Sequence, residues 1–292
     1  MRLLWTKIQG IFMFQILTRI AIMITERFRN TIVKENFPKH IVDFTTFDKG
    51  NYSRYEPIDI TIGSGQNLYV LVKPYRKHSD DSWWPLAGFC VLNYSFEGDF
   101  KQEFYFTQFE EEWSPAAIAY YDGYIFVTNG RIIKRISECN GQSSDISLPI
   151  NEKNVNTWPD IHTTDMAIAN GSIWLVGQAS FSDNSVGCHI TKLDPTCKDR
   201  ETFYSQGRTN FYGANPNQPG VALDRNGNIF VATCYCKSLE IFNYEGKFLT
   251  QIEIGDERSN TTLPFGVAIG RNEDVYILDH ASDVVHVYKV RL

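Results

Sequence analysis

The side chains that could do chemistry are spread widely along the 292 residues, beside apolar segments. Asp59 and Asp165 each stand directly before an apolar run, where carboxylates could bind Ca²⁺ or another hard cation. The same carboxylates could instead accept hydrogen bonds from backbone N–H groups at the start of a strand. His162 and His280 could bind zinc nearby, with Tyr235 as an acid or base. This set of residues would suit a metal-dependent lyase or hydrolase that uses Ca²⁺ or Zn²⁺.

A second set of candidate residues favours binding over catalysis. The polar segment KPYRKHSDDSWWP at 73–85 contains His78 and ends in Trp83 and Trp84. Tryptophan provides a large contact area at low entropic cost. Two tryptophans at the end of a loop therefore suggest that the loop clamps a bound ligand. The alternative is a loop that folds over its own sheet and buries both rings. Trp113 and Tyr235 are the other aromatic candidates for ligand binding.

The charge of the chain argues against nucleic acid as a partner. The net charge is −6, whereas nucleic-acid-binding domains carry a basic excess. RNA binding would need a continuous basic face, for which the candidates are Lys73, Arg76, Lys77, Arg131, Lys134 and Arg135. The sequence also lacks a G-x-S-x-G elbow, a P-loop, an H-E-x-x-H motif and a dinucleotide fingerprint. The sequence therefore leaves open whether the protein is an enzyme.

The elements that must position these residues form an internal repeat. Residues 218–254 and 264–290 both consist of an apolar strand, an Asn-containing turn, a second apolar strand, a loop and an alternating strand. Weaker copies occupy 57–72, 115–137 and 163–178. The five copies are aligned on the middle residue of the first strand, which is Thr61, Ala119, Ala167, Ala222 or Ala268.

This repeat predicts an all-β fold, a β-propeller of five or six blades. The spacings between copies are 58, 48, 55 and 46 residues, which suit four-stranded blades with loop insertions. The last copy ends after its third strand, VVHVYKV, and we expect IVDFTTF at 41–47 to pair with it and close the ring. Ligands are expected at the face where loops join the second strand of a blade to the third, and the fourth to the next blade.

The first forty residues differ from the rest, so we divide the chain into an N-terminal segment, 1–40, and a propeller, 41–292. The N-terminal segment is strongly apolar but is interrupted by Arg19, and no small-residue cleavage site follows Leu17. It could be a degenerate sixth blade, a packed helix, or a poor signal or anchor. Contact with a membrane is expected only through residues 1–35, and the compartment stays undecided.

The best repeat resembles a known family. The pattern P-x-G-V-A, followed by G-N-h-F-V-A and a final G-K-F-L, is similar to an NHL repeat over 218–249. The resemblance extends well over 218–290, loosely over 57–217, and does not reach 1–40. It implies a propeller whose relatives are binding modules, substrate-recognition domains and a few enzymes.

A shorter resemblance concerns the segment YCKSLEIF at 235–242. It is similar to the tyrosine–cysteine segment of the peptidyl-hydroxyglycine amidating lyase propeller. That resemblance implies a catalytic role for Tyr235 and a disulfide-forming role for Cys236, with zinc held by histidines. The chain lacks the matching histidine motifs around its first strands. We therefore expect a non-catalytic propeller that binds a protein, a peptide or a small ligand at the loop face.

Overall fold

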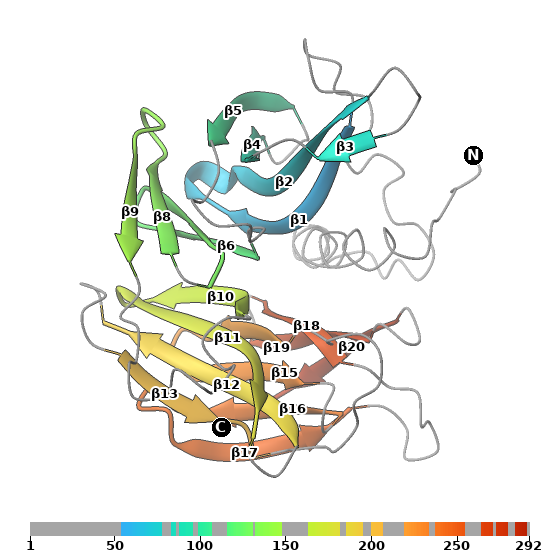
Figure 1. Ribbon diagram of the computed structural model, residues 1–292. Helices are drawn as coiled ribbons and strands as arrows, with labels where there is room; N and C mark the ends of the chain where they lie inside the picture. The colour runs from blue at the N-terminus through green and yellow to red at the C-terminus, as the bar shows by residue number, and fades with distance from the viewer. Residues whose placement is uncertain are drawn as a thin grey trace, which may run out of the picture. The chain divides into compact units, whose positions relative to one another are not determined.

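In the residues that it describes, the computed structural model contains antiparallel sheets and one short 3₁₀ helix (Figure 1). It describes residues 54–77, 83–85, 88–95, 99–106, 116–130, 132–147, 163–181, 185–194, 200–206, 219–233, 237–254, 264–270, 273–279 and 284–290. Within these ranges, no helix is long and apolar enough to cross a membrane.

The first two sheets follow the chain in simple order. The first contains β1 (Arg54–Ile62), β2 (Leu68–Lys77), β4 (Phe89–Tyr94) and β5 (Phe100–Phe106), with β3 (Trp83–Pro85) paired to β2 and helix η2 (Ser64–Gln66) in its first turn. The second contains β6 (Ala117–Tyr121), β7 (Tyr124–Thr128), β8 (Ile132–Ser137) and β9 (Ser143–Ser147).

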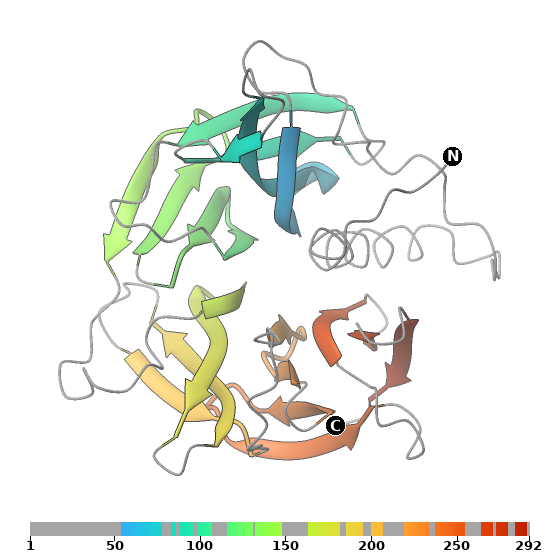
Figure 2. The ribbon, with the colours of Figure 1, turned by 45° about the vertical axis from the view of Figure 1, so that its right-hand side comes forward.

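The remaining three sheets have the same meander topology. The third contains β10 (Thr163–Ala169), β11 (Ser172–Ser180), β12 (Val186–Leu193) and β13 (Arg200–Tyr204). The fourth contains β14 (Gly220–Leu223), β15 (Ile229–Thr233), β16 (Ser238–Phe242) and β17 (Phe248–Glu253). The fifth contains β18 (Pro264–Ile269), β19 (Asp274–Asp279) and β20 (Val284–Lys289). Figure 2 shows the strong twist of the strands within each sheet.

The sheets confirm the predicted all-β propeller fold, with five blades among the described residues. The predicted alignment holds in the strand register, because Thr61, Ala167, Ala222 and Ala268 each pair with an aromatic residue of the next strand. Those partners are Tyr69, Trp174, Phe230 and Tyr276. A sixth blade, closure by 41–47 and the boundary at residue 40 all fall outside the described residues.

The chain divides into two compact units, residues 1–127 with 136–143 and residues 128–135 with 144–292. In the first unit, β1 contacts β6, so the first strands of the first two sheets are neighbours. In the second unit, β14 contacts both β10 and β18. Propeller blades are adjacent through their first strands in this way.

Apolar side chains fill the space between neighbouring sheets of the second unit. One buried cluster joins Trp174 and Val176 of the third sheet to Val231 and Phe242 of the fourth. A second cluster, which includes Phe230, joins the fourth sheet to the fifth. Because both faces of the fourth sheet are covered by a neighbouring sheet, even a charged residue in its third strand, Glu240, is buried. Burial of this apolar surface is the main stabilising contribution to such a stack.

Candidate functional site

Buried polar residues gather at one end of the sheets in the second unit. We call it the loop end, because there the second strand of each sheet runs into the loop before the third. The residues buried at this end are Thr128, Asn129, Ser185, Ser205, Thr233, Ser238 and Asp279. Burying polar groups is costly unless they are hydrogen-bonded, so their concentration at one end sets that end apart.

A pair of aromatic side chains, of which Tyr204 is exposed and Phe181 is half-buried, stands at the loop end of the third sheet. Phe181 follows β11 directly, and its ring meets the ring of Tyr204 edge-on, with centroids 5.5 Å apart. Tyr204 ends β13 and is 39% exposed, one of six large apolar side chains open to solvent among the described residues. An exposed tyrosine fixed by a neighbouring ring offers a rigid surface with a polar tip, which suits recognition.

Hydrogen bonds to β12 fix the chain that follows Tyr204. The backbone N–H of Ser205 donates to the carbonyl of Cys188 at 2.9 Å, and the N–H of Cys188 donates to Oγ of Ser205 at 3.1 Å. Beside Cys188, His189 is buried, and its Nδ1 lies 3.4 Å from Oγ1 of Thr191. The end of β13 is therefore held firmly against β12.

A fully buried carboxylate lies behind this segment. Glu240 stands in the middle of β16 with 0% exposure, and its Oε2 accepts a hydrogen bond from the backbone N–H of Gln206 at 3.0 Å. Phe242, two residues further on and on the same side of the strand, packs against the third sheet. Glu240 therefore faces the third sheet and connects β16 to the residues just after β13. We call Phe181, Tyr204, Ser205, Gln206 and Glu240 the rim cluster.

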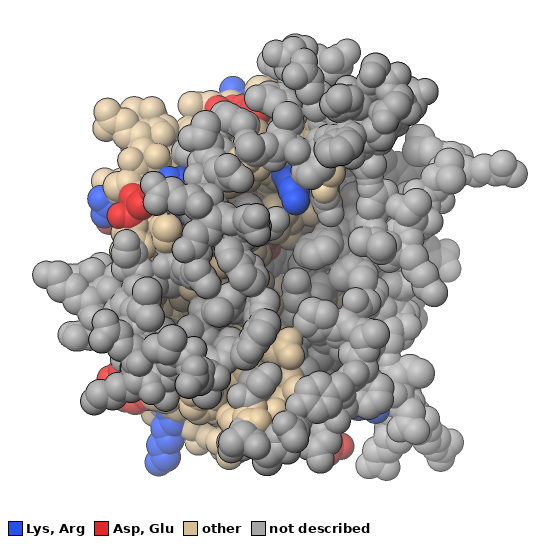
Figure 3. Space-filling model, viewed as in Figure 1, with Lys and Arg blue, Asp and Glu red and all other residues tan. Residues whose placement is uncertain are grey.

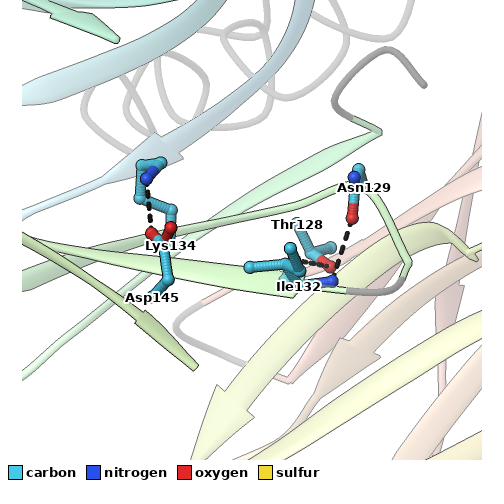
Figure 4. A network of polar contacts seen from close by, with 5 residues as sticks. All are labelled: Thr128, Asn129, Ile132, Lys134 and Asp145. Atoms are coloured by element: carbon cyan, nitrogen blue, oxygen red, sulfur yellow. Dashed lines mark hydrogen bonds and ion pairs between the residues drawn. The ribbon is translucent and has the colours of Figure 1, made fainter. Parts of the chain in front are cut away.

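The turn between β7 and β8 is a second ordered part of the loop end (Figure 4). Oγ1 of Thr128 donates to the carbonyl of Ile132 at 3.0 Å, and Oδ1 of Asn129 accepts from the N–H of Ile132 at 3.0 Å. Gly130 has a φ of +91°, and a Cβ there would approach Oγ1 of Thr163 to 3.2 Å. The turn therefore needs glycine at this position, both for its backbone conformation and for its close packing.

Among the basic residues considered for RNA binding, the structure describes the side chains of Lys73, Lys134 and Arg135. Lys134 is buried and forms an ion pair with Asp145 (Figure 4). Lys73 lies 6.0 Å from the centre of the Tyr75 ring. On the described part of the face in Figure 3, Lys and Arg side chains stand apart from one another, with Asp and Glu side chains among them. Arg135 is exposed on β8.

The two predicted metal-binding carboxylates accept hydrogen bonds from the backbone. Asp59 accepts from the N–H groups of Ile60 at 2.8 Å and Ile118 at 2.9 Å. Asp165 does the same with Met166 at 2.8 Å and Val221 at 2.9 Å. Each carboxylate thus connects the first strand of its own sheet to the first strand of the next.

Neither Asp59 nor Asp165 belongs to a group of described side chains that could bind a metal ion. Across the described ranges, no group of three or more His, Cys, Asp or Glu side chains is arranged to hold a metal ion. His286 Nε2 and Asp279 Oδ2 lie 3.6 Å apart and form a pair. The geometry supports the alternative that the sequence left open, in which Asp59 and Asp165 accept hydrogen bonds from backbone N–H groups.

The predicted aromatic clamp is described in part. Trp83 and Trp84 form β3, where they pair with Lys77 and Arg76 of β2. The predicted loop thus folds back as a fifth strand of its own sheet. Other predicted site residues lie outside the described ranges, namely His78, Trp113, His162, Tyr235 and His280.

Comparison with known proteins gives similarity in fold only. No family model matches the chain, and no curated protein matches it. A virginiamycin B lyase from Staphylococcus aureus is 12% identical with a TM-score of 0.45, over 81% of this chain and 85% of that one. A protein proposed to be a gluconolactonase is 12% identical with a TM-score of 0.44, over 75% and 69%.

A third similar structure is the extracellular domain of a proposed one-component system from B. thetaiotaomicron. It is 12% identical with a TM-score of 0.46, over 88% of this chain but only 29% of that one. The resemblance of residues 218–290 to NHL repeats therefore remains a prediction from sequence.

Sequence reasoning found only part of the rim cluster. It predicted ligands at the face where the second strand of a blade runs into the loop before the third, which is where Phe181 lies, but it did not select Tyr204 or Glu240. A signal for Glu240 was present, since the segment SLEIF places a single charge in an otherwise apolar strand. Tyr204 carries no comparable signal, because its exposure depends on how β13 ends.

Proposed function

We propose that the chain is a non-catalytic β-propeller that binds a protein, a peptide or a small ligand at its loop end. The observation that carries this proposal is the rim cluster. It combines an exposed tyrosine, Tyr204, and the half-buried Phe181 ring beside it with a backbone segment that the buried Glu240 fixes in place. Exposed aromatic side chains on a rigid support are typical of binding surfaces.

The proposal assigns no catalytic step to the described residues. Asp59 and Asp165 hold backbone N–H groups, which leaves less of each carboxylate free for a cation. We also propose that nucleic acid is not the partner, because Lys134 is buried in an ion pair and the net charge is −6. Trp83 and Trp84 are proposed to add a second contact surface on the first sheet.

The test compares two exposed tyrosines, Tyr204 at the end of β13 and Tyr124 at the start of β7. Peptides that bind the purified protein are selected from a random display library and then titrated against Tyr204→Ala and Tyr124→Ala. Tyr124 begins β7 away from the loop end and is 37% exposed, against 39% for Tyr204, so it is a closely matched control. We expect Tyr204→Ala to weaken binding by about tenfold or more, the usual effect of losing a central aromatic contact.

Tyr124→Ala should leave the affinity unchanged. Equal losses in both variants, or none in either, would remove the rim cluster as the binding surface. A Trp83→Ala, Trp84→Ala double variant tests the second surface separately. Circular dichroism of each variant establishes whether the sheets are intact.

A further inference from the structure

In the second and fourth sheets, the turn between the third and fourth strands reaches the preceding sheet, and in the fifth sheet the residue after the third strand does so. Glu138 stands in the turn of the second sheet and contacts Tyr69 of the first. Tyr244 stands in the turn of the fourth sheet and contacts Trp174 of the third. Val290, just after β20, packs into the cluster that joins the fourth and fifth sheets. The receiving residues Tyr69, Trp174 and Phe230 are themselves equivalent in register.

Glu138 is surrounded by hydrogen-bond donors. Its Oε1 accepts from the Tyr69 hydroxyl at 2.6 Å and more weakly from Nδ2 of Asn67 at 3.4 Å. Its Oε2 accepts from the Tyr120 hydroxyl at 2.7 Å, and Oγ of Ser64 lies 2.8 Å from both carboxylate oxygens. Three of these four donors belong to the first sheet, so one carboxylate connects two sheets.

The neighbouring groups favour the charged form of this carboxylate. The rings of Tyr69 and Tyr120 are stacked, with an interplanar angle of 3° and centroids 5.9 Å apart, which aims both hydroxyls at Glu138. Lys101 of β5 donates to Oδ1 of Asn67 at 2.5 Å and adds a positive charge nearby. The turn between β6 and β7 contributes an acid, Asp122, which stands just before Gly123. The carbonyl of Gly123 accepts a hydrogen bond from the N–H of Glu138.

The equivalent contacts in the other two pairs of sheets depend on different chemistry. Tyr244 meets Trp174 edge-on, and its hydroxyl lies 2.7 Å from Oγ of Ser172. The ammonium of Lys192 lies 3.9 Å from the centre of the Tyr244 ring and donates to the Tyr244 carbonyl at 3.2 Å. Where the fourth and fifth sheets meet, Val290 packs in an apolar cluster. Among the described residues, the contacts that hold Tyr244 and Val290 in place involve no carboxylate.

We propose that the contact between the first and second sheets is an acid-sensitive latch, formed by Glu138 with Tyr69, Tyr120 and Ser64. Protonation of Glu138 removes the charge that the hydroxyl groups solvate and places a proton where a donor already points. The turn at 137–142 then separates locally from the turn at 63–67, while the contacts made by Tyr244 and Val290 persist.

The direction of the pH effect follows from the pKa of Glu138. Partial burial alone would raise this pKa, but the hydrogen bonds from Tyr69, Tyr120, Ser64 and Asn67 outweigh it and hold the pKa below the ordinary value of 4.5. A carboxyl whose pKa is lowered by folding contributes stability that is complete above its unfolded pKa. That contribution is lost as the pH falls below 4.5 and through the folded pKa.

The test measures local opening by amide hydrogen exchange with mass spectrometry on the full chain. Protection factors, corrected for intrinsic exchange rates at each pH, are compared between peptides covering 63–69 and 137–142 and a reference peptide covering 238–254. Wild type should lose protection in the first two peptides by about tenfold relative to the reference between pH 6 and pH 3, as expected for losing hydrogen bonds to a charged group.

Three variants separate the latch from a general effect of acid. Glu138→Gln should already be about tenfold less protected at pH 6 and should show no further relative loss on acidification. Tyr120→Phe removes one donor, so protection falls at pH 6 but the pH dependence remains. Glu245→Gln, an exposed acid in the equivalent turn of the fourth sheet, should behave as wild type. Equal pH dependence in wild type and Glu138→Gln, or equal acid loss in the reference peptide, would overturn the proposal.

Discussion

Replacing Asp165 by Ala removes the carboxylate that connects the third sheet to the fourth. Asp165 is 3% exposed, and its two oxygens accept from Met166 at 2.8 Å and from Val221 at 2.9 Å. A hydrogen bond to a charged group contributes about 1.5–3 kcal/mol, and a buried donor left without its acceptor costs about 1–3 kcal/mol. We therefore expect Asp165→Ala to lower the free energy of unfolding by about 2–4 kcal/mol.

The assay is equilibrium urea unfolding of the full chain, followed by tryptophan fluorescence and by circular dichroism. Asp165→Asn keeps one acceptor oxygen but turns an N–H donor toward another donor, so it should lose about 2 kcal/mol. Glu201→Gln on β13, an exposed acid of the same unit, should stay within about 0.5 kcal/mol of wild type.

A loss in Asp165→Ala no larger than that in Glu201→Gln would refute the claim that this carboxylate connects the two sheets. A chelator distinguishes the metal-binding alternative. If a cation were held at Asp165, chelation would lower the melting temperature of wild type but not of Asp165→Ala. We expect chelation to leave the melting temperatures of wild type and of Asp165→Ala unchanged.

Other predictions concern close contacts in the turns. Gly246→Ala should destabilise the protein by about 2–4 kcal/mol, because a Cβ there would come within 2.4 Å of the Phe203 ring and φ is +79°. Gly123 has the same φ of +79°, but a Cβ there would meet no atom within 4 Å. Thermal melting of Gly123→Ala should therefore show only the backbone cost of about 1 kcal/mol. Tyr244→Phe loses the contact with Ser172 and should cost about 1 kcal/mol in urea unfolding. Equal losses in the two glycine variants, or a neutral Tyr244→Phe, would contradict these contacts.

The sequence was most informative about the first two strands of each sheet. Aligning the copies on residues such as Ala167 and Ala222 was sufficient to predict equivalent register, because alternation of side chains fixes which residue faces the core. The same alignment selected Asp59 and Asp165 as special. It could not decide between cation binding and hydrogen bonding to the next sheet, because the partner N–H groups lie 59 and 56 residues further along the chain.

The rim cluster could be predicted only in part, for two physical reasons. Glu240 interrupts an apolar strand, and alternation would place it on a solvent face, but a middle strand between two sheets has no such face. Tyr204 is exposed because β13 ends beside Phe181, a contact between segments separated by the whole of β12. Trp83 and Trp84 were predicted at the end of a loop, and the structure adds that this loop returns to pair with β2.

The most direct measurement of binding at the loop end is an exchange footprint of the protein with a selected peptide bound. Amides in 177–181, 185–190 and 200–206 should exchange more slowly in the complex, while those in 62–69 and 120–124 should not change. Slowing confined to 62–69 and 120–124, with the rim cluster exchanging as in the free protein, would contradict the account.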